Sequence, residues 1–215
     1  MKKLIIIGAS GFGREVAWLV ERINKNRQEW DLLGFIDDNK SLTGEVINGY
    51  TVLGTTDCIG EYLDAFFVCA IGASKTRESI INRISKDNPG LKFATVIDPS
   101  VEKSDLVSIG EGCIVCAHTI LTVNIAIGSH VIINLDCTVG HDAVLNDFVT
   151  LYPSVNVSGM TEVGTCSELG TGMQIIQGKK IGRKTIVGAG AVVVKDIPDN
   201  CTAVGSPAKP IKFHE

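Results

Sequence analysis

One histidine of the sequence is placed to do acid–base chemistry. His141 is followed directly by Asp142, in the segment Val139-Gly140-His141-Asp142. A neighbouring carboxylate can orient an imidazole ring and raise its basicity, and imidazole is a suitable general base near neutral pH. We therefore interpret His141 as a candidate base. The alternative is a histidine that points outward from a turn and takes no part in chemistry.

A second group of residues is suited to binding a phosphate-bearing ligand. Residues 8–13 read Gly-Ala-Ser-Gly-Phe-Gly, and Asp37 and Asp38 follow the next aliphatic run. Glycines let a backbone approach a ligand, and the first N–H groups of a helix attract an anion. Ligands of open parallel sheets bind beside the carboxyl ends of the strands. We expect a nucleotide site here; a tight turn beside two solvated aspartates is the alternative.

The element that must position His141 is a six-residue repeat. From Ile109 to Val193, fifteen positions spaced six apart are all Ile, Leu or Val, and glycine follows seven of them. A period of six fits neither a helix nor a simple strand and is typical of a parallel β-helix. Three repeats close a coil of roughly eighteen residues, so the repeats form about five coils.

The coil length predicts which residue lies beside the candidate base. Gly159 follows His141 by one coil and should stack directly next to it. Its N–H could then hold a thioester carbonyl or a developing oxyanion. His118 and His130 occupy the outward fourth place of their repeats, and His214 lies near the end of the sequence. We expect these three histidines to be surface residues.

The residues before the repeat predict a small parallel sheet with helices on its faces. Strands are expected at 4–7, 33–36, 66–71 and 93–97, and helices at about 14–24 and 75–86. Asn48-Gly49 indicates a hairpin turn. Asp98-Pro99 marks the boundary, so we expect a Rossmann-like domain over residues 1–98 and a β-helix over residues 99–215.

Composition restricts the function classes. The net charge of −4 without a basic cluster argues against nucleic-acid binding, and no apolar run is long enough to span a membrane. The apolar run after Lys2-Lys3 is too short for a signal peptide. Seven scattered cysteines indicate reduced thiols and a cytoplasmic protein. Cys113-x-x-Cys116 lacks a second pair, so we expect no metal site.

These features resemble the hexapeptide-repeat acyltransferases, whose repeat forms a left-handed β-helix. Residues 204–209, Val-Gly-Ser-Pro-Ala-Lys, are similar to the closing motif of many such acetyltransferases. The Gly-Ala-Ser-Gly turn, the Asp37-Asp38 pair, Ala70-Ile71-Gly72 and the β-helix together resemble one subfamily. It comprises the bacillosamine-type nucleotide-sugar N-acetyltransferases and the sialic-acid O-acetyltransferase-like proteins of surface-glycan synthesis.

The resemblance implies a homotrimer that binds acetyl-CoA in the groove between neighbouring β-helices. It also implies that the base is His141, supported by Asp142, in a family that usually carries Glu at the second position. The nucleotide sugar would contact Ser10, Gly11, Phe12, Asp37, Asp38 and Gly72, with Asn134 facing the acceptor sugar. The cofactor path would include Thr150, Gly159, Thr171 and Ala189.

We therefore expect acetyl transfer from acetyl-CoA to an amino group of a nucleotide-linked sugar. Because the thioester is already activated, direct attack suffices, with His141 taking the proton and the Gly159 N–H stabilising the oxyanion. Three alternatives remain. They are an O-acetyltransferase acting on sialic acid or a polysaccharide, a non-catalytic β-helix that binds a nucleotide sugar, and an NAD-dependent oxidoreductase. The last is disfavoured because the glycine spacing is not Gly-x-Gly-x-x-Gly.

Overall fold

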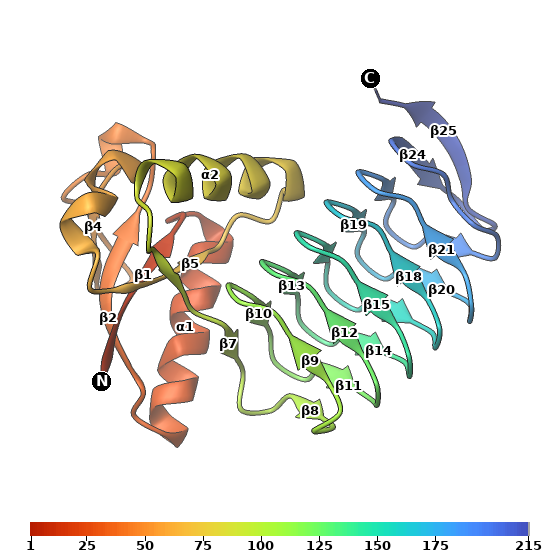
Figure 1. Cartoon of the computed structure of the whole chain (residues 1–215), viewed down its shortest axis with the longest axis horizontal. Coiled ribbons are helices and arrows are strands. Elements are labelled where there is room, and N and C mark those ends of the chain that lie inside the picture. Colours follow the sequence, from red (N-terminus) through yellow and green to blue (C-terminus); the bar gives the residue numbers. More distant parts are fainter. Residues whose placement is uncertain (215) are drawn as a thin grey trace.

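The chain forms two domains that lie side by side (Figure 1). A computed structural model describes residues 1–214. The first domain is a parallel sheet with a helix on each face, and the second is a parallel β-helix whose coils lead away from it. None of the helices within these residues is long and apolar enough to cross a membrane.

The N-terminal sheet has the strand order β3-β4-β2-β1-β5-β6. Its strands are parallel except β3, which forms a hairpin with β4 through Asn48 and Gly49, both with positive φ. The hairpin prediction is therefore confirmed. The strands are β1 (Lys2–Ile7), β2 (Trp30–Ile36), β3 (Val46–Ile47), β4 (Tyr50–Gly54), β5 (Phe66–Cys69) and β6 (Lys92–Phe93). Two 3₁₀ helices, η1 (Lys40–Leu42) and η2 (Thr56–Tyr62), flank β3 and β4.

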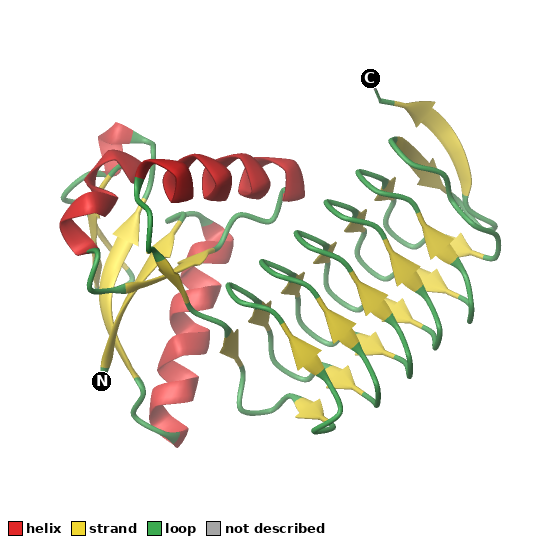
Figure 2. Ribbon diagram, viewed as in Figure 1, coloured by secondary structure: helices red, strands yellow, loops and turns green. Residues whose placement is uncertain are grey.

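Two α-helices cover the two faces of this sheet (Figure 2). Side chains alternate across a strand, so Leu4 and Ile6 of β1 face one side and Ile5 and Ile7 the other. Helix α1 (Gly11–Asn26) packs on the Leu4 side through residues such as Val16. Helix α2 (Ser74–Asp87) packs on the Ile5 side through Ile81 and Ile84.

The β-helix is a triangular prism whose three faces are parallel sheets of short strands (Figure 1). The first face contains β7 (Val96–Ile97), β10 (Ile114–Val115), β13 (Ile132–Ile133), β16 (Thr150–Leu151), β19 (Glu168–Leu169), β22 (Ile186–Val187), β24 (Cys201–Val204) and the antiparallel β25 (Lys209–Phe213). The second contains β8 (Glu102–Lys103), β11 (Ile120–Leu121), β14 (Thr138–Val139), β17 (Asn156–Val157), β20 (Gln174–Ile175) and β23 (Val192–Val193). The third contains β9 (Ser108–Ile109), β12 (Ala126–Ile127), β15 (Val144–Leu145), β18 (Glu162–Val163) and β21 (Lys180–Ile181).

The predicted register of the repeat is confirmed. Strand pairs join residues eighteen apart, as in Ile133↔Leu151 and Val139↔Val157. Every aliphatic repeat position from Val115 to Val193 is buried, and Ile109 packs against their cluster at the first coil. These side chains form one continuous core along the axis of the prism, and their burial is the main source of stability in this domain.

The first face of the prism carries the contact with the N-terminal domain. Ile114, Cys116 and Ile132 point out of the β-helix and share a buried cluster with α1. Arg22 of α1 adds an ion pair to Asp98, with Nε 2.6 Å from Oδ2, and the Asp98 side chain is almost fully buried. The two domains are thus fixed to one another by both apolar and charged contacts.

Several element boundaries differ from the prediction, among them those at the domain junction and at the start of α1. The single strand expected over 93–97 is wrong, because β6 joins the N-terminal sheet whereas β7 pairs with β10 of the β-helix. Thr95 lies between them and donates a hydrogen bond to the carbonyl of Gly110. Helix α1 begins at Gly11 rather than near Arg14, because only Gly8 of the glycine turn has positive φ.

Candidate functional site

The carboxyl ends of β1, β2 and β5 open into a cavity of about 150 Å³. Ser10, Asp37 and Asp38 line it together with Thr56 and Ile71, among others. The structure therefore brings together three of the residues predicted to bind a nucleotide. This edge of a parallel sheet is the position at which doubly wound folds bind their ligands.

The two aspartates have different partners. Asp37 accepts a hydrogen bond from the Ala9 N–H at 2.8 Å, which holds the glycine turn against β2. Asp38 accepts from the N–H and hydroxyl of Thr56 and pairs with Arg83, whose Nη2 lies 2.9 Å from Oδ2. Burial opposes ionisation of Asp38, but the hydrogen bonds from Thr56 and Arg83 outweigh it and lower its pKa. Both carboxylates are thus engaged within the protein, with Asp37 facing the cavity.

The glycine turn is tightly packed beneath the cavity. A side chain at Gly13 would overlap the carbonyl of Gly8, so the start of α1 can approach β1 only with glycine at this position. Gly11 and Phe12 lie in the first turn of α1 but do not line the cavity. Phe12 packs instead against the apolar cluster under α1.

Gly72 and Asn134 both lie next to Tyr152, Gly72 by packing and Asn134 by its position one coil earlier. A Cβ built on Gly72 would lie 3.8 Å from the Tyr152 ring, so the loop after β5 rests on the β-helix here. Asn134 occupies the equivalent position one coil before Tyr152, and its N–H donates to Leu151. The Asn134 side chain accepts a hydrogen bond from the Leu135 N–H at 2.7 Å.

His141 lies on the corner between β14 and β15, the edge where the second and third faces meet. Its Nδ1 is 2.8 Å from Oδ2 of Asp142, and the two side chains are about half exposed. The hydrogen bonds from His141 and Asn124 lower the pKa of Asp142, which keeps the carboxylate ionised near neutral pH. A proton held on Nδ1 by this carboxylate leaves Nε2 free to accept one from a substrate.

Gly159 stacks directly against the His141 ring. A Cβ built on Gly159 would stand 2.5 Å from Nε2 of His141, so only glycine fits beside the ring in this position. The Gly159 N–H forms no hydrogen bond within residues 1–214. The arrangement therefore offers a proton acceptor and a free backbone donor side by side at one corner.

Three further residues expected on the cofactor path, Thr150, Thr171 and Ala189, do not lie on the corner that carries His141. Thr171 and Ala189 stack one coil apart, exposed on the corner between the first and second faces. The side chain of Thr150 is buried, and its hydroxyl bonds Gly72 and Arg77. Thr150 is therefore a residue of the domain contact that a ligand cannot reach through its side chain.

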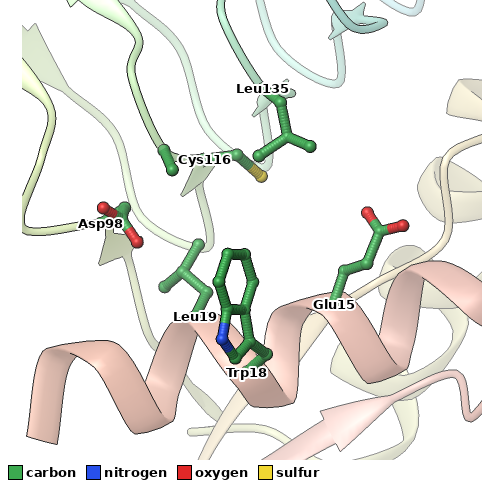
Figure 3. Close-up of a pocket in the computed structure, with 7 residues that line it drawn as sticks. Glu15, Trp18, Leu19, Asp98, Cys116 and Leu135 are labelled. Atoms are coloured by element: carbon green, nitrogen blue, oxygen red, sulfur yellow. The ribbon is translucent and has the colours of Figure 1, made fainter.

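Another small pocket lies where α1 meets the corner before β14 (Figure 3). Trp18 and Leu19 of α1 face Cys116 and Leu135 of the β-helix, and the Glu15 carboxylate points toward the open side. The lining is mostly apolar. The pocket thus lies at the contact between α1 and the β-helix.

His130 differs from the surface residue that was predicted. Its ring is buried and stacked on Phe148, and it packs edge-to-face with Phe93 at a centroid distance of 4.7 Å. The prediction is wrong because the N-terminal domain covers this corner of the β-helix. His118, at an equivalent repeat position on an uncovered corner, is exposed as expected.

Arg77 is a residue that sequence reasoning missed. It is fully buried in α2 and hydrogen-bonds carbonyl groups of both domains. Burial lowers its pKa from the ordinary arginine value. The only sequence signal was an arginine at a position of α2 that shares a face with Ile81 and Ile84. Among the described residues no cluster of His, Cys, Asp and Glu could hold a metal ion.

Comparison with known proteins identifies relatives of both domains. The sequence family of PglD N-terminal domains matches residues 3–84 of this chain. The acetyltransferase domain of PglB from Neisseria gonorrhoeae is 34% identical, with a TM-score of 0.89 over 98% of this chain and 100% of that one. It is also known in complex with acetyl coenzyme A. The match confirms the predicted fold, a Rossmann-like domain followed by a left-handed β-helix.

A second solved relative contains two bound ligands. It is a histidine-to-asparagine mutant of perosamine N-acetyltransferase from Caulobacter crescentus, in complex with CoA and GDP-perosamine. It is 29% identical, with a TM-score of 0.86 over 99% of this chain and 98% of that one. A galactoside O-acetyltransferase of Lactococcus lactis is 49% identical over 39 residues, 18% of this chain and 19% of that protein. The chain spans about a fifth of the length of the curated relatives it matches.

Proposed function

Because this chain belongs to the hexapeptide-repeat sugar acetyltransferases with a PglD-type N-terminal domain, we propose that it acetylates an amino group of a nucleotide-linked sugar. Acetyl-CoA is the acetyl donor, and the reaction serves surface-glycan synthesis in the cytoplasm. The observation that carries the proposal is the contact of His141 with both Asp142 and Gly159. A solved relative with CoA and GDP-perosamine is an N-acetyltransferase, which favours an amine over a hydroxyl acceptor.

The reaction follows from this corner of the β-helix. The sugar nitrogen attacks the thioester carbonyl as the neutral amine, and His141 Nε2 accepts the proton that this nitrogen loses as the C–N bond forms. The Gly159 N–H donates to the carbonyl oxygen as it gains negative charge. Asp142 holds the ring and stabilises the imidazolium that forms. The tetrahedral intermediate then collapses to the amide and releases the CoA thiolate, which takes up a proton.

The two halves of the site belong to different subunits of a homotrimer. The cavity lies in the N-terminal domain, which packs on the first face of the prism. His141 lies on the edge opposite that face. A sugar bound in one subunit therefore reaches the histidine of a neighbour. Asn134 and Tyr152, which lie one coil apart near Gly72, would face the sugar, and Thr171 and Ala189 would contact CoA in the groove between β-helices.

The test is a direct assay of acetyl transfer. Purified protein is incubated with acetyl-CoA and a panel of UDP- and GDP-linked amino sugars, with free amino sugars and sialic acid for comparison. Acetylation of a nucleotide-linked amine, detected by mass spectrometry, supports the proposal. Acetylation only of a hydroxyl would favour the O-acetyltransferase alternative. Tight binding of NAD without binding of UDP or GDP would contradict the nucleotide assignment of the first domain.

A further inference from the structure

Arg77 is a buried cation that is held by hydrogen bonds to uncharged groups and not by a direct ion pair among residues 1–214. It is fully buried, and within residues 1–214 it forms no ion pair. A buried charge is costly unless hydrogen bonds satisfy it, and an apolar side chain could fill the same space. Filling of the core therefore does not explain an arginine at this position. The hydrogen bonds that its guanidinium group donates must be what the fold uses.

The guanidinium group divides its donors between the two domains. Toward the β-helix, Nε donates to the carbonyl of His130 at 2.9 Å and Nη2 to that of Phe148 at 2.8 Å. Toward the loop after β5, Nη1 donates to the carbonyls of Ile71 at 2.6 Å and Gly72 at 3.1 Å. The planar fork of arginine holds these groups at fixed angles, which lysine could not do.

Thr150 completes the contact. Its hydroxyl accepts from Nη2 of Arg77 at 2.9 Å and donates to the Gly72 carbonyl at 2.8 Å. The start of α2 is held to the same coils, because Glu168 accepts from the N–H and hydroxyl of Ser74, each at 2.9 Å. Gly72 and Ser74 are thus tied directly to the β-helix, and Ile71 is tied to it through Arg77.

The loop that is held in this way is a wall of the nucleotide cavity. Ile71 lines the cavity together with Asp37, and Gly72, the next residue of the loop, packs beside the Tyr152 ring. We propose that Arg77 and Thr150 are positioning residues that fix this wall on the β-helix, and so set the affinity for the nucleotide and the direction in which its sugar leaves the cavity. The inference rests on the proposed nucleotide-binding function of the cavity and does not require that acetyl transfer occur.

The test uses Thr150→Val in the full chain, because replacing Arg77 can prevent folding altogether. Valine has the shape of threonine but cannot bond Gly72 or Arg77. We expect the Kd for UDP or GDP, measured by calorimetry, to rise about five- to ten-fold, as expected for loss of buried hydrogen bonds. The Kd for acetyl-CoA should not change. Thr150→Ser, which keeps the hydroxyl, should restore the nucleotide affinity.

Thr185→Val is the matched control. Thr185 is equally buried in the β-helix and donates to the Pro198 carbonyl at 2.7 Å, away from the first domain. The Thr185→Val substitution should lower the melting temperature about as much as Thr150→Val does. It should leave the Kd for UDP or GDP unchanged. Hydrogen exchange provides a readout without ligand: the peptide over residues 70–74 should exchange faster in Thr150→Val and not in Thr185→Val.

The outcomes separate the two proposals. Unchanged nucleotide affinity in Thr150→Val, with or without faster exchange, would overturn the positioning role and leave the proposed function intact. Equal losses in Thr150→Val and Thr185→Val would show a merely structural role and would also overturn it. A wild-type protein that binds neither UDP nor GDP would overturn the nucleotide assignment itself, and the inference with it.

Discussion

Because Gly159 has no side chain, the ring of His141 can occupy the space directly beside it. A Cβ on Gly159 would stand 2.5 Å from Nε2, although the two residues are one full coil apart in the sequence. The His141 ring and the Gly159 backbone are therefore held side by side by the stacking of coils. Such fixed donors stabilise developing charge at little reorganisation cost.

Gly159→Ala should displace the His141 ring from its place beside the backbone. We expect kcat to fall on the order of a hundred-fold, because both the base and the donor lose their alignment. Acetyl-transfer kinetics and a thermal melt check this. Gly60→Ala, in η2 of the other domain, is the control and should retain the wild-type rate. A fully active Gly159→Ala would show that this stacking has no part in the reaction.

Asp142→Asn tests the support of the base. The hydrogen bond with His141 is the main cause of the lowered pKa of Asp142, so the charged carboxylate is the form that holds the ring. We expect kcat to fall about ten-fold, less than the roughly 10²–10⁴-fold typical of losing a general base. KM for acetyl-CoA should change little. A variant as inactive as His141→Ala would mean that Asp142 has a more direct role than orientation and charge.

Mixing two inactive variants tests whether the site is shared between subunits. Asp37→Ala should weaken binding of the nucleotide in the cavity. His141→Ala removes the proposed base from the opposite edge of the prism. Co-expressed subunits should regain part of the activity, since some interfaces pair an intact cavity with an intact histidine. Light scattering should give a trimer mass. A monomer mass near 22.9 kDa, or mixed oligomers without activity, would contradict the shared site.

The buried His130 should make folding sensitive to acid. Burial, with the nearby charge of Arg77, lowers its pKa to about 4, whereas Asp147 acts in the other direction. The unfolded chain therefore binds a proton between pH 6.5 and 4 that the folded chain excludes. The free energy of unfolding should fall by roughly 3 kcal/mol as the pH falls through this window.

Urea unfolding at several pH values measures this dependence. His130→Asn, a side chain that tolerates the positive φ of 56° at this position, should flatten the slope between pH 6.5 and 4. His118→Asn is the matched control, because His118 has a φ of 61° and is exposed. An unchanged slope in His130→Asn would mean that other groups cause the acid sensitivity.

The β-helix and the corner that carries His141 could be predicted because they depend on one local rule repeated many times. The inward aliphatic residues and the coil length together determine which residues stack on one another. The contact of Gly159 with His141 could therefore be predicted from their separation of one coil. The cavity at the strand ends was predictable for a similar reason. Strand ends of a parallel sheet meet at one edge, which brings Ser10 and Asp37 together.

The contact between the domains could not be predicted in this way. His130 and Thr150 occupy outward positions of the repeat, and the pattern does not reveal that the first domain covers them. Arg77 reads as a solvated residue in a polar helix, because its partners are mostly backbone carbonyls with no sequence signature. Likewise, β7 belongs to the β-helix because Val96 pairs with Ile114, a register that the hydrophobic pattern of 93–97 does not contain.

The central claim, that His141 is the base for acetyl transfer, is tested most directly by His141→Ala. The side chain lies outside the aliphatic core and is about half exposed, so the melting temperature should stay close to that of the wild type. With acetyl-CoA and the acceptor found in the panel, kcat should fall about 10²–10⁴-fold. A folded His141→Ala protein that keeps more than about a third of the wild-type rate would contradict the claim.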